Sequence, residues 1–178
     1  MRVIPAYAGG LDGRPAIQAF FKKSGVTEID VLVSLTGFSL VGGPAYNDSV
    51  AAVKELKALD VPYIAAHPLE FQTLEQWDGS SQGLGPIETT MLIALPELDG
   101  ATNPTVFAGR HGESSIGSDK SAAVVGNPMA PCHERIEKLG ARIEKLANLR
   151  RAEVCNKKVA VVLFGFPPNA GAAGTAAY

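Results

Sequence analysis

The sequence contains IDVLVSL at residues 29–35 and VPYIAA at residues 61–66, two short and strongly apolar runs. Runs of this length and composition are typical of strands that are buried on both faces of a sheet. The segment between them places apolar side chains at a helical spacing over residues 50–59, and Asn47 or Asp48 can cap its first turn. Strand, helix and strand in this order predict a βαβ unit with parallel pairing.

Further segments extend this pattern in both directions along the chain. We expect a strand at 3–7, a helix opened by Pro15, a short helix at 73–77, a longer helix from Pro86 to Pro96, a strand at 105–108, a helix at 133–151 and a buried strand at 158–165. The predicted fold class is therefore α/β, with a mostly parallel sheet and flanking helices in a Rossmann-like or flavodoxin-like three-layer arrangement.

The same pattern divides the chain into three parts. Residues 1–110 form the predicted α/β domain. Residues 111–131 lose all periodicity and are rich in Gly, Ser and Ala, which predicts a flexible surface excursion. Residues 132–178 hold the long helix, the buried strand and the start of a further helix. Because that last helix has barely begun at Tyr178, we expect the chain to be a truncated, interior piece of a longer protein.

Composition excludes several classes of protein. The 178 residues are 46% hydrophobic with a formal net charge of −2, which argues against a disordered chain and against a nucleic-acid-binding surface. No apolar run approaches the roughly 18 residues of a membrane span, and Pro5 and Gly9-Gly10 interrupt any secretory signal. With only Cys132 and Cys155, we expect a reducing compartment and no disulfide framework.

Nucleotide and structural-metal motifs are absent from the sequence. It has no G-x-x-x-x-G-K-[ST], so we expect no P-loop and no ATP bound by this chain. It also lacks G-x-G-x-x-G, C-x-x-C and H-E-x-x-H, which excludes the dinucleotide fingerprint and the common zinc sites. The chemistry of this chain must therefore come from other residues.

Acidic residues and one histidine lie beside predicted strand and helix ends. His67 follows the strand at 61–66, at the edge where open α/β sheets bind ligands, although a structural histidine remains the alternative. Glu75 lies in the next helix, and Glu88 lies in a first helical turn, where the helix dipole favours an acid. Glu97 and Asp99 lie at the end of that helix. A carboxylate there opposes the dipole, which indicates another requirement for Glu97.

Several longer blocks resemble a known family. They are residues 31–45, 62–65, 71–77, 94–100, 106–110, 166–169 and 174–178. In these blocks the sequence is similar to the large porphyrin-binding (H) subunits of the magnesium chelatase family, a wider group that includes the CobN-type large subunit of cobaltochelatase. Subunits of this family are several times longer than this chain, so the resemblance also implies an interior fragment.

The resemblance implies a part in the ATP-dependent insertion of Mg²⁺ into protoporphyrin IX, a metal-ligase step of chlorophyll and bacteriochlorophyll biosynthesis in photosynthesis. ATP would be used by AAA+ partner subunits I and D, and the remaining domains of the large subunit would complete the site. The implied location is the bacterial cytoplasm or the plastid stroma, with no membrane span and no nucleic acid. Two alternatives stay open: a cobaltochelatase segment and a non-catalytic tetrapyrrole-binding or docking module.

The resemblance also implies roles for individual residues. Glu97 is the expected metal ligand and proton acceptor, with Asp99 and Glu75 as further catalytic carboxylates. His67 and Glu88 are expected to contact the porphyrin. These roles suit the chemistry, because Mg²⁺ prefers oxygen ligands and releases its water reluctantly. Metallation also removes two pyrrole protons, which a carboxylate near the ring can accept. We expect these acidic groups to gather at one end of the domain, and the isolated fragment to be inactive.

Overall fold

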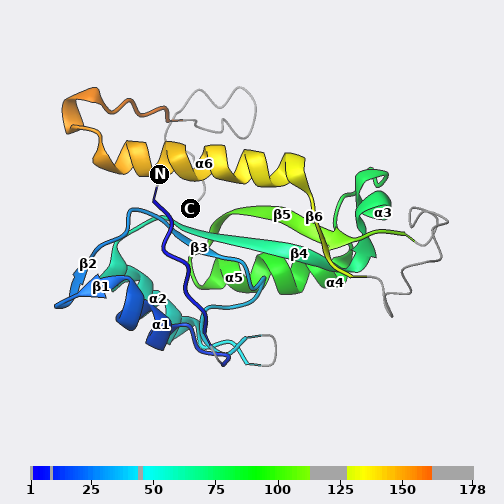
Figure 1. The fold of residues 1–178 in the computed structure, drawn as a ribbon, viewed down its shortest axis with the longest axis horizontal. Coiled ribbons are helices and arrows are strands. Elements are labelled where there is room, and N and C mark those ends of the chain that lie inside the picture. The colour runs from blue at the N-terminus through cyan, green and yellow to red at the C-terminus, as the bar shows by residue number, and fades with distance from the viewer. Residues whose placement is uncertain (1, 9, 44–45, 113–127, 162–178) are drawn as a thin grey trace, which may run out of the picture.

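The computed structural model describes residues 2–8, 10–43, 46–112 and 128–161. Its elements are arranged as Figure 1 shows. In chain order they are α1 (Arg14–Phe20), β1 (Lys22–Lys23), β2 (Val26–Thr27), β3 (Leu32–Ser34), α2 (Ser49–Leu59), β4 (Tyr63–Thr73), α3 (Leu74–Asp78), α4 (Pro86–Glu88), the π-helix η1 (Thr89–Ala94), α5 (Leu95–Leu98), β5 (Thr102–Arg110), β6 (Ala130–Pro131), α6 (His133–Arg151) and the 3₁₀-helix η3 (Val154–Asn156).

The larger sheet has four strands in the order β3-β4-β5-β6. β4 pairs in parallel with β3 on one side and with β5 on the other, where His67 lies opposite Val106. β6 pairs with the end of β5 in antiparallel orientation, which needs no crossover helix. The α/β class is confirmed. The sheet itself is mixed, so it differs from the mostly parallel, Rossmann-like arrangement that the sequence predicts.

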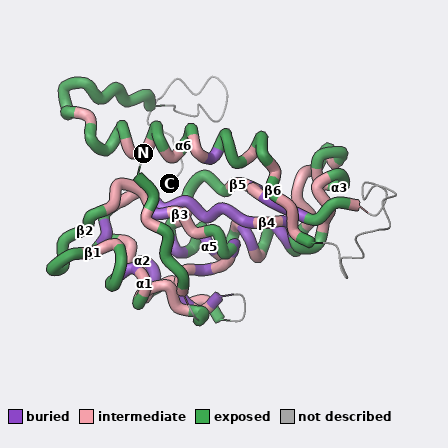
Figure 2. The backbone as a smooth tube through the Cα atoms, viewed as in Figure 1, coloured by how far each residue is buried: buried purple, intermediate pink, exposed green. Residues whose placement is uncertain are grey.

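Helices cover both faces of this sheet, and the alternation of side chains along β4 shows how. Tyr63 packs with Ile17 of α1 and Leu59 of α2 on one face. The next residue, Ile64, packs with Leu139 of α6 on the other face. Figure 1 shows α6 along one side of the sheet and α1 and α2 on the opposite side. β4 is the buried centre of the molecule, as its purple course in Figure 2 shows.

The helices confirm most of the sequence prediction. α1 begins beside Pro15, α6 has the predicted bounds, and α2 follows Asp48, whose side chain accepts a hydrogen bond from the Ala51 N–H at 2.9 Å. Val50 differs from the prediction, because it points away from the core and is exposed. Among the described helices, none combines the length and the apolar content needed to cross a bilayer.

Strand lengths differ from the prediction more than helix bounds do. β4 continues from Tyr63 to Thr73, so His67 lies in the middle of a strand rather than after its end. Pro68 is tolerated there because the register with β5 shifts on either side of it, at an irregularity where a missing N–H costs little. The hairpin of β1 and β2 was not predicted, because two-residue strands leave no alternating pattern to detect.

The helix predicted from Pro86 to Pro96 is continuous but not regular. It consists of α4, the π-helical turn η1 and α5. Pro96 explains part of this, since its nitrogen cannot donate and its ring would clash with the carbonyl four residues back in an α-helix. In η1 the Leu95 N–H instead reaches the Thr90 carbonyl, five residues back, which widens the turn before the proline.

Two predicted strands are not formed in the residues that the structure describes. Residues 3–7 have no strand partner and are largely exposed, and residues 158–161 are likewise exposed and irregular. Apolar composition alone predicted these strands, and pairing depends on the rest of the fold. Residues 162–165 of the second strand, the glycine-rich turn at 166–174, the start of the last helix and most of the excursion at 111–131 lie outside the described residues. At the end of that excursion, Ala130 and Pro131 form β6.

Candidate functional site

Asp99 is a buried carboxylate that anchors the loop after β3. It is 1% exposed. Its Oδ2 accepts hydrogen bonds from the Ser39 hydroxyl at 2.7 Å and from the Leu40 N–H at 2.9 Å. Burial, with a smaller contribution from the Asp99 charge, raises the pKa of nearby Tyr63 to about 12, so this phenol stays protonated. Asp99 thus connects the end of the α4–η1–α5 segment to the loop at residues 39–41.

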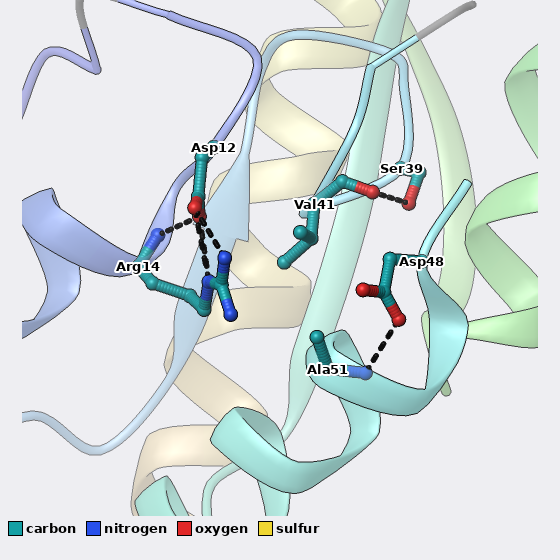
Figure 3. A network of polar contacts seen from close by, with 6 residues as sticks. All are labelled: Asp12, Arg14, Ser39, Val41, Asp48 and Ala51. Atoms are coloured by element: carbon teal, nitrogen blue, oxygen red, sulfur yellow. Dashed lines mark hydrogen bonds and ion pairs between the residues drawn. The ribbon is translucent and has the colours of Figure 1, made fainter. Parts of the chain in front are cut away.

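The loop at residues 39–41 has further polar contacts, as Figure 3 shows. The Ser39 hydroxyl lies 3.1 Å from the Val41 carbonyl, and Val41 forms an isolated bridge with Asp12. Asp12 in turn binds the Arg14 guanidinium through both carboxylate oxygens, at 2.6–3.0 Å, and this hydrogen bonding lowers the pKa of Asp12. These contacts fix the loop at residues 39–41 within the domain.

Glu88 is a second buried carboxylate that holds main chain. It is 1% exposed, and its Oε1 accepts the N–H groups of Glu70 at 3.1 Å, Phe71 at 3.0 Å and Gln72 at 3.3 Å. Three donors on one oxygen offset much of the cost of burying an acid. Glu88 therefore stabilises the irregular end of β4, where the strand leaves its regular pairing with β5.

His67 lies next to Glu88 in the core. The ring is 1% exposed, and neither ring nitrogen has a hydrogen-bond partner among the residues described. Burial lowers the pKa of His67, while the negative charge of Glu88 and, to a smaller extent, the Ala65 backbone oppose that shift. Gly37, at φ 73°, packs against it: a Cβ at Gly37 would lie 3.0 Å from the His67 Cβ. The histidine is thus neutral and tightly enclosed on this side.

Glu75 and Glu97 are exposed, in contrast to the two buried acids. Glu75 lies in α3, which begins with a capping box at Thr73. Its carboxylate binds the His111 ring at 2.7 Å and the Gly112 N–H at 2.8 Å. Glu97 lies in α5, and its side chain has no hydrogen bond or ion pair within the described part of the chain. Among the four predicted carboxylates, Glu97 is thus the one that is exposed and has no partner in the described residues.

The predicted site residues do not converge on one place. The register pairs Ile64 with Thr102 and Thr73 with Arg110. The eight-residue span of β5 between these pairs corresponds to about 26 Å at the usual rise of a parallel strand. α5 leads into the start of β5 and α3 follows the end of β4, so Glu97 and Glu75 lie at opposite ends of the sheet (Figure 1).

No single metal centre is assembled by these residues. Within residues 2–8, 10–43, 46–112 and 128–161, no three His, Cys, Asp or Glu side chains lie together as a metal ion requires. The structure brings His67 and Glu88 together, and it places Asp99 in a separate hydrogen-bonded network. The predicted gathering of acids at one end of the domain is therefore not found among the described residues.

A positively charged pocket is the feature that the sequence prediction missed. It has a volume of about 200 Å³ and lies between α6, Trp77 of α3 and the edge of β5. Arg135, Lys138 and Arg142 of α6 line it, together with His67. Their spacing of three and four residues on one helix was the available signal. The prediction used the apolar positions of that helix, which pack on the sheet, and the spacing of Glu134 and Lys138, but it did not consider the basic residues as a group.

One short motif also needs the structure to be understood. Residues 79–83 read GSSQG, which has the letters of the G-x-S-x-G nucleophile elbow. In that elbow the serine sits on a sharp turn between a strand and a helix. Here Gly79 caps the C-terminus of α3, and residues 80–83 form a turn rather than a strand. The context of a serine hydrolase is therefore absent at this segment.

In the residues that it describes, the structure thus shows an α/β domain with two buried acids that bind main chain, an exposed Glu97 and a cationic pocket. A family model described as CobN/Magnesium Chelatase matches residues 1–178, and the chain belongs to this family. It is 64% identical to the magnesium-chelatase H subunit of Cereibacter sphaeroides, over 99% of this chain and 15% of that protein. It is 45% identical to the chloroplastic magnesium-chelatase ChlH subunit of Oryza sativa subsp. indica, over 99% of this chain and 12% of that protein.

A more distant relative carries a different metal in its name. The chain is 25% identical to the aerobic cobaltochelatase CobN subunit of Sinorhizobium sp, over 98% of this chain and 13% of that protein. All three relatives are thus much longer than this chain, which spans 15% or less of their length. The fragment-like character expected from the sequence is consistent with these shares.

Proposed function

We propose that this chain is a segment of the large subunit of a magnesium chelatase and takes part in inserting Mg²⁺ into protoporphyrin IX. The observation that carries the proposal is the 64% identity to a magnesium-chelatase H subunit across 99% of the chain. The identity to the cobaltochelatase relative is only 25%. This contrast favours magnesium over cobalt and a protoporphyrin over a corrin-type ring.

In this proposal Glu97 is the residue that handles the ion. It is exposed and carries no internal partner in the described residues, so its carboxylate can exchange with the water shell of Mg²⁺ or accept a pyrrole proton. Asp99 supports it from two residues away by fixing the end of the helical segment to Ser39 and Leu40. Glu75, at the other end of the sheet, acts as a second carboxylate on another part of the substrate.

His67 and Glu88 complete the proposed porphyrin side of the domain. Glu88 shapes the end of β4 through its three main-chain bonds, and His67 borders the cationic pocket. The energy for dehydrating Mg²⁺ comes from ATP hydrolysed on separate AAA+ subunits, I and D. The remaining parts of the large subunit close the site, in the bacterial cytoplasm or the plastid stroma. This proposal keeps the division of the chain into three parts. They are the α/β domain at 1–110, the surface excursion at 111–131 and the part at 132–178 that begins with the long helix.

The test is Glu97→Gln in a full-length subunit that carries this segment. We expect Mg²⁺ insertion, assayed with partner subunits and ATP, to fall by about tenfold or more, because a neutral amide neither exchanges with the ion's water nor accepts the proton. Porphyrin affinity should remain within about twofold. Glu144→Gln, an exposed acid on α6, is the matched control and should leave insertion unchanged. Unchanged turnover in Glu97→Gln would remove this residue from the mechanism.

Asp99→Asn separates support from chemistry. We expect it to lower the free energy of unfolding by about 1–3 kcal/mol, because the charged acceptor of two buried hydrogen bonds is lost. Glu97→Gln should change the same quantity by no more than about 0.5 kcal/mol, as for other exposed positions. Chemical denaturation of both variants measures the difference.

Tighter binding of a cobalt-free corrin precursor than of protoporphyrin IX by the full-length subunit would instead favour a cobaltochelatase.

A further inference from the structure

The cationic pocket carries no role in the proposed function beyond its contact with His67. Three cations, Arg135, Lys138 and Arg142, approach it from α6. Because these residues are three and four positions apart, they share one side of the helix. The structure therefore presents a row of positive charge beside a hollow in the surface, at the part of β5 that β6 does not cover.

The acidic partners of this row are few and weakly held. Glu134 pairs with Arg135 at 2.8 Å and with Lys138, but these side chains are between about a third and two thirds exposed. Exposed pairs of this kind contribute little and exchange readily with other anions. Arg142 binds the Thr105 hydroxyl at 2.8 Å, and no carboxylate in the described part of the chain pairs with it. The pocket thus has unused capacity for an anion.

The other walls are aromatic and apolar. The Arg135 guanidinium lies 5.1 Å from the centre of the Trp77 ring, and Leu84, Ile93 and Val106 also line the pocket. A stacked arginine is pre-organised and flat, which suits a planar molecule that carries carboxylates. A simple inorganic anion would gain nothing from the apolar walls. The lining therefore fits an organic anion with an apolar body.

His67 gives an independent reason to expect a ligand here. It borders the pocket, it is 1% exposed, and both of its ring nitrogens lack hydrogen-bond partners among the described residues. A buried polar group without a partner is costly, of the order of 1–3 kcal/mol. A polar atom of a ligand in the pocket would relieve that cost. The neutral ring carries one N–H, which can donate to a carboxylate.

The size of the pocket decides how much of a ligand it holds. Its volume of about 200 Å³ is below the roughly 300–1,000 Å³ of sites that enclose a whole small molecule. A tetrapyrrole does not fit inside it, whereas the carboxylate-bearing edge of one does. Ile93 of the pocket wall and Glu97 belong to the same helical segment, because η1 continues directly into α5.

We propose that the pocket between α6, Trp77 and the edge of β5 binds the carboxylate edge of a flat organic anion, with Lys138 and Arg142 as its charge partners. This inference rests on the proposed function in one respect, because the porphyrin substrate is the flat anion that it supplies. The two propionate groups of protoporphyrin IX enter the pocket, and the apolar macrocycle lies outside it. Lys138 and Arg142 are thereby specificity-determining residues.

Trp77 makes the test direct, because it is the only tryptophan in the 178-residue chain. The folded chain is titrated with deuteroporphyrin IX, which has the same two propionates, and with its dimethyl ester. Tryptophan quenching reports binding. We expect the free acid to bind at least tenfold more tightly than the ester. Lys138→Gln and Arg142→Gln should each weaken the free acid about tenfold, as expected for one charge-assisted hydrogen bond.

Lys145→Gln is the matched control, since it removes an exposed charge from the same helix outside the pocket. It should change affinity by no more than about twofold. Equal binding of acid and ester overturns the proposal, and so do equal effects of Lys138→Gln and Lys145→Gln. A glutamate-rich peptide would also overturn it if the peptide bound the pocket more tightly than the porphyrin does. The natural ligand would then be an acidic protein segment.

Circular dichroism of each variant establishes that the fold is kept. Lys138 is the primary site because its exposed side chain supports no core contact, so its replacement should not unfold the chain. Mg²⁺ insertion by the full-length subunit separates the two proposals. Wild-type insertion by a full-length Lys138→Gln and Arg142→Gln double variant refutes the pocket and leaves the proposed function standing. If the unmodified full-length subunit inserts no Mg²⁺, the proposed function itself is refuted.

Discussion

Glu88 and Asp99 are buried acids whose carboxylates accept hydrogen bonds from the protein itself. Each is 1% exposed. One oxygen of Glu88 accepts three main-chain N–H groups, and one oxygen of Asp99 accepts the Leu40 N–H and the Ser39 hydroxyl. An unpaired buried carboxylate costs several kcal/mol, so these hydrogen bonds are needed for the acids to be tolerated at all. Glu97 has none of these contacts. Acids that lie close together in the sequence therefore have opposite uses, and only their surroundings distinguish them.

His67 leads to a prediction about pH. Burial lowers the pKa of His67, so the folded chain holds it neutral at a pH where the unfolded chain already binds a proton. The unfolded state then binds more protons, and the free energy of unfolding falls as pH decreases. This loss begins near pH 6.5, the usual histidine value, and ends at the lowered pKa of the folded state. Above pH 7 the residue should contribute no pH dependence.

Denaturant unfolding of the chain between about pH 5 and pH 7.5 measures this effect, over the range in which histidines titrate. His67→Gln should flatten the slope across that window, because glutamine cannot take up the proton. His133→Gln, an exposed histidine at the start of α6, should leave the slope as it is. A slope that survives in His67→Gln would show that other groups cause it.

The five candidate side chains, Glu97, Glu75, Asp99, His67 and Glu88, were chosen from the sequence for their chemistry. Whether each of them is buried or exposed could not be predicted. Asp99 and Glu97 are two residues apart in the chain, yet one is buried and the other exposed. Which of them turns inward depends on Ser39 and Leu40, about 60 residues away in the sequence. The cationic pocket was missed for the same reason. Its walls come from several segments, among them β4, α3, β5 and α6, which no local pattern connects.

At the scale of elements, α6 is held by a few buried side chains. Leu139 is 6% exposed and packs on Ile64 and Ala66 of β4, with Ile143 and Leu146 beside it. Leu139→Ala should lower the free energy of unfolding by about 2–5 kcal/mol, since it removes buried methyl groups and leaves a cavity. Thermal or chemical unfolding measures the loss.

Leu149→Ala is the control on the same helix, because Leu149 is 53% exposed. It should change the free energy of unfolding by no more than about 0.5 kcal/mol. Equal effects at the two positions would mean that α6 does not pack on the sheet through Leu139. The comparison also tests the two-sided covering of the sheet, which depends on this helix.

Helices were predicted better than strands because their signals are local. The spacing of apolar residues and the Asp48 cap lie within α2 itself, and the bounds of α6 follow from its own periodicity. A strand needs a partner from elsewhere in the chain. Residues 3–7 have the composition of a strand without a partner, whereas β4 continues past Pro68 because β5 and the Glu88 carboxylate accommodate the irregularity.

For the whole molecule, apolar layers provide the stability and long-range ion pairs add orientation. Arg151 at the end of α6 binds Asp30 before β3, which are 121 residues apart. Arg142 adds a long-range hydrogen bond to the Thr105 hydroxyl of β5, which is not an ion pair. Exposed pairs contribute about 0–1 kcal/mol each, so the packing of α1, α2 and α6 on the two faces of the sheet must provide most of the stability.

The chain also leaves apolar side chains exposed in segments without regular structure. Val3, Tyr7, Val159 and Val161 are each at least 70% exposed, in two segments that belong to no strand or helix. Exposed apolar clusters favour association with another surface. We therefore expect the isolated chain to self-associate with increasing concentration, whereas a full-length subunit would cover these residues with its own other parts.

Sedimentation velocity over a concentration series tests this expectation. A Val3→Ser and Tyr7→Ser double variant should shift the chain toward monomer, because it removes apolar area that association would bury. Val50→Ser is the control, since Val50 is 80% exposed but belongs to the regular helix α2. If the unmodified chain stays a single monomeric species at every concentration, these residues do not form a contact surface. The apolar area that needs burial is then already covered by the helices on the two faces of the sheet.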